Sequence, residues 1–518
     1  MRLADYFDAT AERQPERIAL EDQGVSMTFG QAQRFVHAAA HALDREPGLR
    51  PGAHIGLYSP NDHRVPLLHL AINRSDRVWL SAHTRNPVEV NIEVLSFMDC
   101  EFMFFHSAYE KLVPQLKSGL PKVVRFVCID RPSEFGPSLE EWMTGDGAPY
   151  RGGFEDPLAT AVLQPTGGTT GPSKAAVYTH RSLEMMFIAS RECFAYTPES
   201  RSLAVAPLTH AGGMVALANL CCGGTVVVIN LTSPAQALDE VERARITHLF
   251  LPPTLLYMAL AEMERAPRDV SSLRMFTTGS APIAPEKVKE ATRVFGPVVT
   301  EGFGLTECGM PLVWKGPQDY LGADGSFDDA VLASTGRAVA FARVEIMDEG
   351  GRILPPGERG EIVVQAGTMM REYYKNPQET EAFRRFGWGH SGDVGVKDAR
   401  GYITVVDRLK EMIVTGGFNV FPAQIEAVVL ENEAVLDCAV VGVPDEKWGE
   451  AVKAVVQLKP GMTVDPEVLI AHCRARLGGP ATPKSVEFWP QLPRSAVGKL
   501  LRRDVRKRFW DGHWRAVG

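Results

Sequence analysis

A run rich in glycine and threonine at residues 163–174, LQPTGGTTGPSK, combines residue types that can hold a phosphate chain. Glycines let backbone N–H groups approach an anion closely, threonine hydroxyls add donors, and a lysine adds a cation. The run is not a Walker A loop, because two residues separate Gly171 from Lys174. The alternative is a flexible surface turn. The candidate phosphate ligands are Thr166, Gly167, Gly168, Thr169, Thr170, Gly171 and Lys174.

A second cluster, EGFGLTE at residues 301–307, combines an aromatic ring with carboxylates. Gly302 and Gly304 flank Phe303 and leave its ring face open for stacking on a base. Glu307 beside a phosphate site would be a natural Mg²⁺ ligand, because Mg²⁺ prefers oxygen donors. The alternative is an ordinary loop, since a ring between two glycines is common in loops.

Short segments in the last third of the chain could bind the rest of a nucleotide and an elongated ligand. Asp393, in the turn GWGHSGD, is a carboxylate that can accept both hydroxyls of a ribose. Asp407 and Arg408 follow, and the alternative to a binding role for this pair is a surface salt bridge. Gly416 and Gly417 would let an elongated ligand pass close to the backbone. Residue chemistry alone does not make Lys499, in the segment PRSAVGKLLRR, a catalytic group.

The sequence pattern around these residues predicts the α/β fold class. Apolar runs alternate with amphipathic helical patterns through the first half, which is typical of parallel strands with crossover helices. From about Gly336, short alternating segments between turns indicate a small antiparallel β subdomain, and a smaller α+β unit begins beyond Asp407. We expect strands at 53–58, 123–129, 161–164, 225–229, 248–251, 438–443 and 451–457, helices at 182–195, 234–244 and 422–431, and a final helix after Pro466.

Composition places the chain among ordinary globular proteins. It has 518 residues, 45% hydrophobic and 23% charged, with a net charge of −8. Because no long basic stripe offsets this charge, nucleic acid is not the expected partner. The eight cysteines form no CxxC pair, which suits a reducing compartment. No segment approaches the roughly 20 apolar residues of a transmembrane helix, so we expect a cytoplasmic enzyme.

Taken in this order, the motifs resemble the adenylate-forming superfamily of acyl-CoA synthetases, luciferases and peptide-synthetase adenylation domains. The resemblance extends from about Thr28 to Arg503. It implies a large, multi-subdomain N-terminal α/β domain with a β subdomain, residues 1–407. A small mobile α+β domain, residues 408–518, would follow, with its hinge at Lys410. It also implies ATP, Mg²⁺ and coenzyme A as cofactors.

The resemblance assigns the phosphates and the metal to particular residues. The loop from Thr166 to Lys174 would hold the β- and γ-phosphates of ATP, Thr306 would lie near the α-phosphate, and Glu307 near Mg²⁺. One departure concerns the loop, because the family's usual proline before the lysine is Ser173 here. The contact of Lys174 is therefore less well defined than those of the threonines and glycines.

Adenine and ribose are assigned in the same way. Glu301 would lie near the adenine amino group, and Phe303 stands where the family usually has tyrosine, which keeps stacking and loses a hydroxyl. Asp393 and Arg408 match the two ribose-binding positions, with Ser391 in place of the family's usual threonine. The strand end that lines adenine would comprise Gly279, Ser280 and Ala281.

The resemblance also implies two half-reactions in two domain orientations. Lys499 matches the lysine that bridges the substrate carboxylate and the α-phosphate, where a cation stabilises developing negative charge. Lys410 matches the hinge about which the small domain swings, which would remove Lys499 from the site. The pantetheine tunnel would then be lined by Gly416, Gly417 and Phe418.

The acid pocket is expected to be hydrophobic. His210 matches the residue at its mouth, and we interpret it as a gate rather than a general base, with a core or capping histidine as the alternative. Small and apolar neighbours disfavour an amino acid, whose ammonium group needs a paired carboxylate, and favour a fatty or aryl acid. The candidate pocket residues are His210, Gly212, Gly213, Met214, Gly302, Gly304, Cys308, Gly309 and Met310.

These observations predict an AMP-forming acid–thiol ligase. It would convert a hydrophobic carboxylic acid to acyl-AMP and pyrophosphate, and then to acyl-CoA and AMP. Two alternatives stay open. One is an acyl-AMP former that loads the pantetheine arm of a carrier protein, and the other is a catalytically silent nucleotide-binding homologue. The expected partners are the acid, ATP and CoA, and a homodimer is compatible with the sequence.

Overall fold

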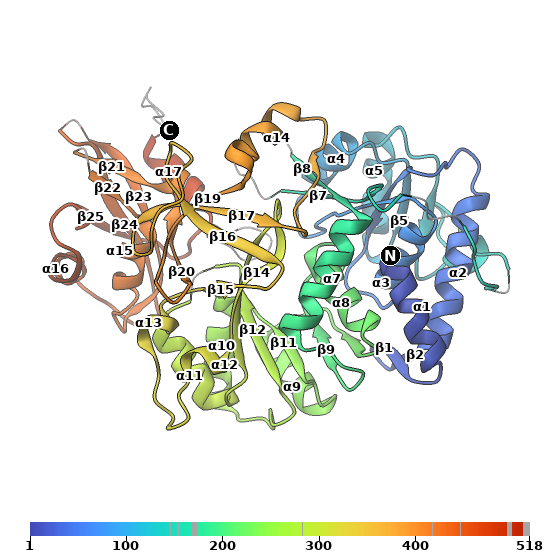
Figure 1. Ribbon diagram of the computed structural model, residues 1–518, viewed down its shortest axis with the longest axis horizontal. Coiled ribbons are helices and arrows are strands. Elements are labelled where there is room, and N and C mark those ends of the chain that lie inside the picture. Colours follow the sequence, from blue (N-terminus) through green and yellow to red (C-terminus); the bar gives the residue numbers. More distant parts are fainter. Residues whose placement is uncertain are drawn as a thin grey trace. The chain divides into compact units, whose positions relative to one another are not determined.

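The computed structural model describes residues 1–145, 147–152, 156–166, 174–281, 283–416, 418–445, 447–494 and 500–510, without the side chain of Asn419. The chain divides into two compact units (Figure 1). The large unit comprises residues 1–344 and 364–389, and the small unit comprises residues 345–363 and 390–518. This division does not test the boundary predicted between 407 and 408, which stays a prediction.

A seven-stranded sheet of the large unit carries the glycine- and threonine-rich segment. Its order is β18-β8-β7-β4-β3-β5-β6, and β3 to β7 are parallel. β8 is antiparallel to β7, and β18 is antiparallel to β8. The strands are β3 (His54–Tyr58), β4 (Val78–Leu80), β5 (Phe102–Phe105), β6 (Phe126–Cys128), β7 (Thr160–Pro165), β8 (Ala175–Thr179) and β18 (Glu372–Tyr373).

Nine further strands of the large unit form a second run, in the order β15-β14-β13-β12-β11-β9-β10-β1-β2. From β13 to β1 the neighbours are parallel, and the outer strands are antiparallel. The strands are β1 (Ile18–Asp22), β2 (Val25–Thr28), β9 (Arg201–Ala204), β10 (Thr225–Val228), β11 (His248–Phe250), β12 (Met275–Gly279), β13 (Val299–Leu305), β14 (Gly309–Lys315) and β15 (Gly336–Ala338).

Helices α1, α3, α7 and α8 pack on one another, with α3 against the first sheet, α8 against the second and α7 against both (Figure 1). The parallel strands between helices are apolar because both faces are covered. The helical segments are α1 (Leu3–Arg13), α2 (Phe29–Arg45), α3 (Arg64–Arg74), α4 (Val88–Phe97), η1 (Ser107–Leu112), α5 (Val113–Gly119), α6 (Leu139–Trp142), α7 (His180–Phe194), α8 (Ala211–Cys221), α9 (Pro234–Arg243), α10 (Pro253–Arg265), α11 (Pro285–Phe295), α12 (Pro317–Tyr320), α13 (Asp329–Leu332), α14 (Pro377–Phe383) and η2 (Arg385–Gly387).

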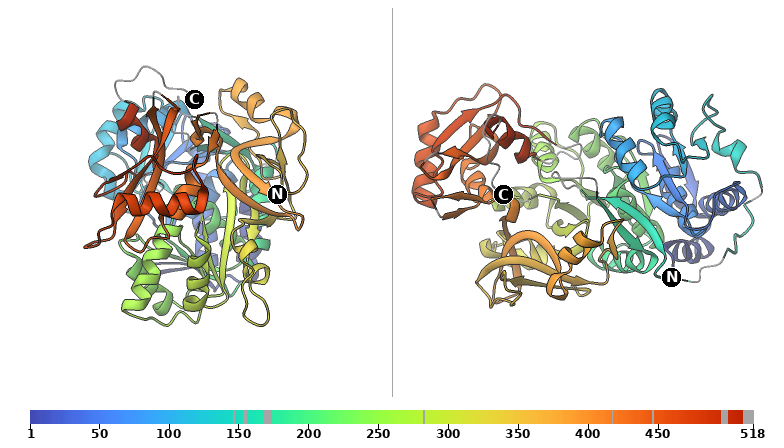
Figure 2. Two further views of the ribbon diagram at one scale, coloured as in Figure 1. Left: turned by 90° about the vertical axis from the view of Figure 1, so that its left-hand side faces the viewer. Right: turned by 90° about the horizontal axis from the view of Figure 1, so that it is seen from above.

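The small unit is built on β21 to β25 and three helices (Figure 2). Alternation on β23 sends Cys438 and Val440 to a core with α15 and α16, and Ala439 and Val441 to a core with α17. The elements that lie wholly or partly in it are β16 (Ala342–Met347), β17 (Arg359–Ala366), β19 (Gly389–Lys397), β20 (Tyr402–Arg408), η3 (Leu409–Glu411), β21 (Ile413–Thr415), β22 (Phe418–Val420), α15 (Pro422–Val429), β23 (Val435–Asp445), β24 (Gly449–Leu458), α16 (Pro466–Leu477), β25 (Ser485–Phe488) and α17 (Arg502–Trp510).

The predicted α/β class is confirmed, and each expected strand and helix overlaps an observed one. One expectation was wrong: the helix after Pro466 is not the final one, because α17 follows it. The sequence of α17 is rich in arginine and buries only Val505, so it has almost no apolar periodicity to detect. Among the described residues, no helix is long and apolar enough to cross a membrane.

Candidate active site

The glycine- and threonine-rich segment lies between β7 and β8, at the carboxyl end of β7. Pro165 pairs with Ala175, and the backbone N–H of Thr166 donates to the carbonyl of Lys174 at 2.9 Å. The two ends of the loop are therefore held together by the sheet. Gly167, Gly168, Thr169, Thr170, Gly171 and Ser173 lie outside the described residues, so their phosphate contacts stay predictions.

Lys174 lies against Tyr373, a residue that the sequence analysis did not select. Its Nζ lies 5.6 Å from the centre of the Tyr373 ring and 2.7 Å from Oε2 of Glu379. Tyr373 reaches this place because β18 pairs with β8, with Tyr373 opposite Ala176. A two-residue strand has no detectable pattern of its own, so no local signal pointed to it.

Thr306 and Glu307 lie in the turn between β13 and β14, next to Tyr373. The Tyr373 hydroxyl donates to Oε1 of Glu307 at 2.8 Å, and the Tyr178 hydroxyl donates to the carbonyl of Thr306. Burial, and then Glu307, raise the pKa of Tyr373 above its usual value, so the phenol stays protonated and donates. Lys174 and Glu307 thus both contact Tyr373, and Thr306 directly precedes Glu307.

Glu301, predicted near adenine, is buried in an ion pair. Its Oε2 lies 2.9 Å from Nζ of Lys315, which is its cross-strand neighbour on β14. Lys315 also donates to the carbonyls of Leu332 and Ser334. Burial raises the pKa of Glu301, and Lys315 opposes that rise. A contact of this carboxylate with adenine stays a prediction, whereas its buried ion pair with Lys315 is observed.

The segment predicted to line adenine lies at the carboxyl end of β12, where α/β sheets bind ligands. Gly279 pairs with Gly302, and a Cβ at Gly279 would lie 2.6 Å from the carbonyl oxygen of Gly302. Ser280 and Ala281 follow at the surface, with Ser280 at a φ of +71°. Phe303 is half-buried on the neighbouring strand. The close strand approach therefore requires glycine at position 279.

In the small unit, Asp393 and Arg408 are cross-strand neighbours on β19 and β20. Arg408 Nε lies 2.8 Å from Oδ1 of Asp393, whose side chain is buried. Ser391 donates from Oγ to the carbonyl of Ile362 at 2.6 Å and accepts from the N–H of Asp393 at 3.0 Å. The serine therefore fixes the backbone beside the carboxylate, as a threonine hydroxyl could.

The predicted hinge and tunnel residues also lie in the small unit. Lys410 is exposed in η3. Gly416 has a φ of +57°, its N–H donates to the carbonyl of Trp448 at 2.9 Å, and a Cβ there would lie 2.4 Å from the Trp448 ring. Phe418 is 58% exposed. Gly417 lies outside the described residues, so its tunnel role stays a prediction.

Lys499 also lies outside the described residues, but both ends of its loop are fixed. Arg494 pairs with Leu500 in a β-bridge, and Leu501 donates its N–H to the carbonyl of Pro493 at 2.9 Å. The next residue, Arg502, contacts the carboxylates of Glu411 and Glu426. This connects the lysine loop with η3, the segment that contains the predicted hinge.

His210 immediately precedes α8 and lies beside a second histidine. Its ring centre is 5.6 Å from that of His83, and neither ring nitrogen of His83 has a hydrogen-bond partner among the described residues. Burial, with a smaller effect of His83, lowers the pKa of His210 to about 4. The lowered pKa indicates a neutral His210 imidazole near pH 7, which agrees with a gate better than with a proton carrier.

The predicted acid pocket residues lie in two groups. Gly212 and Gly213 begin α8 next to Met214, and a Cβ at Gly213 would lie 3.0 Å from the ring of His69. Near β13, a Cβ at Gly302 would lie 3.0 Å from Trp314, a side chain that the sequence analysis did not select. A Cβ at Gly304 would lie 2.5 Å from the Cβ of Met310, and Gly309 has a φ of +74°. Cys308 is fully buried, so it stays a pocket residue only as a prediction.

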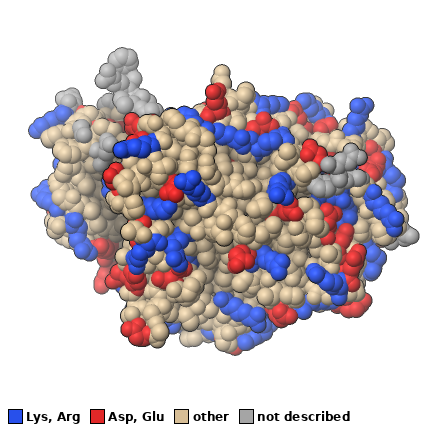
Figure 3. All heavy atoms as spheres, in the orientation of Figure 1, with Lys and Arg blue, Asp and Glu red and all other residues tan. Residues whose placement is uncertain are grey.

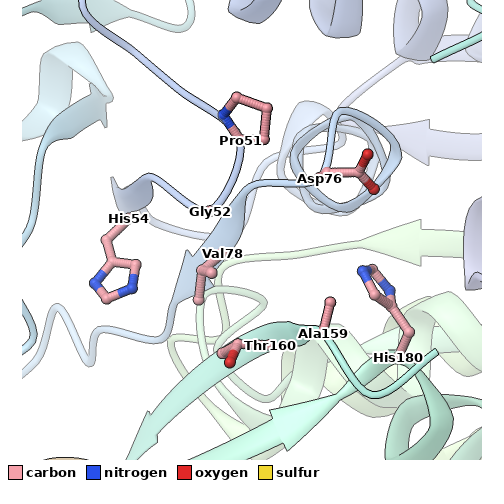
Figure 4. Close-up of a pocket in the computed structure, with 8 residues that line it drawn as sticks. All are labelled: Pro51, Gly52, His54, Asp76, Val78, Ala159, Thr160 and His180. Carbon is pink, nitrogen blue, oxygen red and sulfur yellow. The ribbon is translucent and has the colours of Figure 1, made fainter. Parts of the chain in front are cut away.

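A cavity of about 290 Å³ lies elsewhere in the large unit (Figure 4). His54, Val78 and Thr160 are the first residues of β3, β4 and β7, so the cavity lies at the amino ends of these strands. The candidate site lies at their carboxyl ends, where ligands bind in α/β sheets. The cavity lining is Pro51, Gly52, His54, Asp76, Val78, Ala159, Thr160 and His180.

The visible surface carries both signs of charge. On the face shown in Figure 3, Lys and Arg are interspersed with Asp and Glu. With a net charge of −8, this face offers no basic stripe of the kind that binds a phosphate backbone.

Comparisons with known proteins gave matches over nearly the whole chain. The family model for AMP-binding enzymes matches residues 7–374, and that for the AMP-binding enzyme C-terminal domain matches residues 424–499. The medium/long-chain-fatty-acid–CoA ligase FadD8 of Mycobacterium tuberculosis is 38% identical over 391 residues, 73% of this chain and 67% of the relative. Feruloyl-CoA synthase of an Amycolatopsis species is 33% identical over 502 residues, 96% of this chain and 97% of the relative. The solved structure of the amide bond synthetase McbA from Marinactinospora thermotolerans has a TM-score of 0.88 and 29% identity, covering 98% of this chain and 100% of that one.

Proposed function

Because the chain belongs to the AMP-binding enzyme family, we propose that it is an AMP-forming ligase that joins a hydrophobic carboxylic acid to coenzyme A. One observation carries this proposal. Lys174, at the end of the glycine- and threonine-rich loop, and Glu307, in the turn between β13 and β14, both contact Tyr373. A cation and a carboxylate that contact the same side chain support a site for a triphosphate and its metal.

In the first half-reaction, a carboxylate oxygen of the acid attacks the α-phosphorus of ATP. The bond from that phosphorus to the bridging oxygen breaks, and pyrophosphate leaves. Lys174 and the loop from Thr166 would hold the leaving pyrophosphate, and Lys499 would place a cation at the charge that develops on the α-phosphate. Asp393 and Arg408 would hold the ribose hydroxyls.

In the second half-reaction, the thiol sulfur of CoA attacks the acyl carbon. The bond from that carbon to the AMP oxygen breaks, and the thiol proton leaves with AMP or to water. His210, neutral because its pKa is lowered to about 4, would separate the thiol path from the acid pocket rather than carry this proton. Gly416, Gly417 and Phe418 would line the path of the pantetheine arm.

The oxygen donors of the large unit fit Mg²⁺. The Glu307 carboxylate is the kind of hard oxygen ligand that this cation prefers, and its Oε1 is already oriented by Tyr373. When bound, Mg²⁺ would neutralise charge on the phosphates. Glu307 would hold it.

The acid is proposed to be a fatty or aryl acid. The pocket candidates other than His210 include no carboxylate and no permanent cation, and the similarity to a fatty-acid–CoA ligase and a feruloyl-CoA synthase supports both acid classes. A carrier-protein pantetheine arm is the alternative acceptor. An amine is a further one, because the chain is also similar to an amide bond synthetase.

The test is CoA- and ATP-dependent AMP release across acetate, hexanoate, palmitate, benzoate, coumarate and phenylalanine. A maximum on an alkyl or aryl acid that requires CoA supports the ligase and identifies its class. Pyrophosphate release without CoA-dependent turnover favours carrier loading or amide formation. No ATP–pyrophosphate exchange with any acid would leave the silent nucleotide-binding homologue.

Two further expectations belong to this proposal. We expect the enzyme in the cytoplasm, because its cysteines are unpaired among the described residues. A homodimer is the simplest assembly, and light scattering of the purified chain would distinguish it from a monomer.

A further inference from the structure

Tyr373 connects two parts of the large unit that the proposed function needs together. It follows Glu372 on β18, the strand that pairs with β8 after the phosphate loop. Its hydroxyl contacts Glu307 in the turn between β13 and β14, two strands of the other sheet. Tyr373 therefore contacts both Lys174 and Glu307.

The hydroxyl of Tyr373 limits how the Glu307 carboxylate can turn. A carboxylate at the end of a strand rotates freely about its last bond unless one oxygen is held. Donation to Oε1 at 2.8 Å holds that oxygen, so Oε2 points in a defined direction. A hydrogen-bonded outer group of this kind orients a metal ligand and raises metal affinity.

The ring of Tyr373 positions Lys174, as the hydroxyl positions Glu307. The Nζ cation lies 5.6 Å from the ring centre, within the range of cation–π attraction. Its carboxylate partner, Glu379, is 47% exposed, and an ion pair with so exposed a partner contributes little. The ring therefore helps to position the lysine, and the exposed glutamate can release it to a phosphate.

We infer that Tyr373 is a positioning residue for MgATP, whose hydroxyl orients Glu307 toward the metal and whose ring holds Lys174 toward the triphosphate. The inference rests on the proposed function only in requiring that the chain binds MgATP. The hydroxyl of Tyr373 should affect ATP affinity only when Mg²⁺ is present. The ring should affect ATP affinity with or without the metal.

The test is calorimetric titration with ATP, without any acid, in Mg²⁺ and again in EDTA. Tyr373→Phe keeps the ring and removes the hydroxyl, so the Kd for MgATP should rise about 10-fold, as for other outer-shell partners of metal ligands. The Kd in EDTA should stay unchanged. Tyr373→Leu removes the ring as well, so the Kd in EDTA should also rise, by about threefold or more.

Tyr374→Phe is the matched control. Its hydroxyl donates to Asp99 at 2.6 Å, away from Glu307 and Lys174, so removing it should change neither Kd. The Kd for MgATP of the double variant Y373F/E307Q should equal that of E307Q alone. Both substitutions remove the same contact between Tyr373 and Glu307. Additive losses would overturn the inference, as would a Tyr373→Phe protein that binds MgATP like the wild type.

A second measurement does not depend on a stable variant. 3-Fluorotyrosine at position 373 should shift its fluorine resonance on addition of MgATP and much less with ATP in EDTA, whereas the same label at position 374 should shift in neither case. Equal responses at both positions would overturn the inference. If ATP binds as expected but no acid is activated, the proposed function fails while this inference stands.

Discussion

Arg408 Nε lies 2.8 Å from Oδ1 of Asp393, across a cross-strand pair of β19 and β20. The carboxylate side chain is almost fully buried, and the arginine is half exposed. A carboxylate paired with an arginine has oxygen atoms that accept hydrogen bonds. Two neighbouring ribose hydroxyls are donors that match such a group.

Asp393→Asn should weaken ATP binding by removing recognition of the ribose hydroxyls. Because hydrogen bonds to a charged group contribute about 1.5–3 kcal/mol, we expect the KM for ATP to rise about 10- to 100-fold. The preference for ATP over 3′-deoxyATP should also disappear, since the variant no longer recognises that hydroxyl. Steady-state adenylation with both nucleotides measures this.

Asp398→Asn is a suitable control for that substitution. Asp398 lies between the same two strands, where it pairs with Arg400 at 3.3 Å, and it is not a ribose candidate. The same loss of discrimination in both variants would contradict the ribose assignment.

Most of the candidate site could be proposed from the sequence because its motifs are contiguous, and its ligand contacts stay predictions. The loop from Thr166 to Lys174, the segment from Glu301 to Glu307, and the Asp393 turn each carry their chemistry within a few residues. The α/β class was also predictable, because alternating apolar and amphipathic runs are a local property.

The residues that were missed depend on strand pairing. Tyr373 reaches Glu307 only through the pairing of β18 with β8, and Lys315 reaches Glu301 only through the β13–β14 register. Trp314 meets Gly302 for the same reason. Sequence pattern predicts strands but not which strands are neighbours, so these contacts had no signal. Glu301 shows the consequence, because its carboxylate was assigned to adenine without knowledge of its buried partner.

Lys315→Met should destabilise the large unit strongly. It would leave the Glu301 carboxylate buried without its cation, and breaking a buried pair in this way costs about 3–5 kcal/mol. Urea unfolding measures the loss. The double variant K315M/E301L should recover a large part of it, because no buried charge remains.

Lys287→Met is the matched control for the lysine substitution. Its pair with Glu290 is exposed on both sides, so its loss should cost less than about 1 kcal/mol. Equal effects of the two lysine substitutions would show that the buried ion pair is not important for stability.

Gly302 and Trp314 should set the size of the acid in opposite directions. A Cβ at position 302 would lie 3.0 Å from the indole, so Gly302→Val narrows the space on that side of β13. We expect its kcat/KM to fall about 10-fold or more for the bulkiest acid accepted by the wild type, and less for a short acid. Trp314→Ala should shift the preference toward bulkier acids. A uniform decrease for all acids in both variants would remove these residues from the pocket.

Lys499→Ala and Gly417→Leu should separate the two half-reactions. Without the lysine, adenylate formation should be lost, because no cation meets the developing charge, while CoA transfer from supplied acyl-adenylate is largely kept. Gly417→Leu should do the reverse by blocking the pantetheine path. Pyrophosphate exchange and thioester formation are measured separately, and equal loss of both activities in either variant would contradict its assigned role.

Asp407 should make the stability of the small unit depend on pH. Burial raises its pKa to about 6, opposed by Arg502 and by the N–H groups of Ala423 and Arg408. The folded state therefore holds this proton more tightly than the unfolded state. The stability that protonated Asp407 adds is greatest below the ordinary aspartate pKa, and it is lost as the pH rises through about 6. Since one pKa unit is about 1.4 kcal/mol, the ionised carboxylate costs the folded unit about 3 kcal/mol above that pH.

Asp407→Asn cannot ionise, so this part of the pH dependence should vanish. Because a chain with two units need not unfold in one step, we would follow hydrogen exchange of α15, whose Ala423 N–H donates to Asp407 at 2.8 Å. In the wild type, exchange corrected for its intrinsic rate should become faster from pH 4 to pH 7. In the variant, that change should be smaller by the factor that corresponds to about 3 kcal/mol. Identical pH profiles of the two proteins would show that Asp407 is ionised in the folded unit throughout this range.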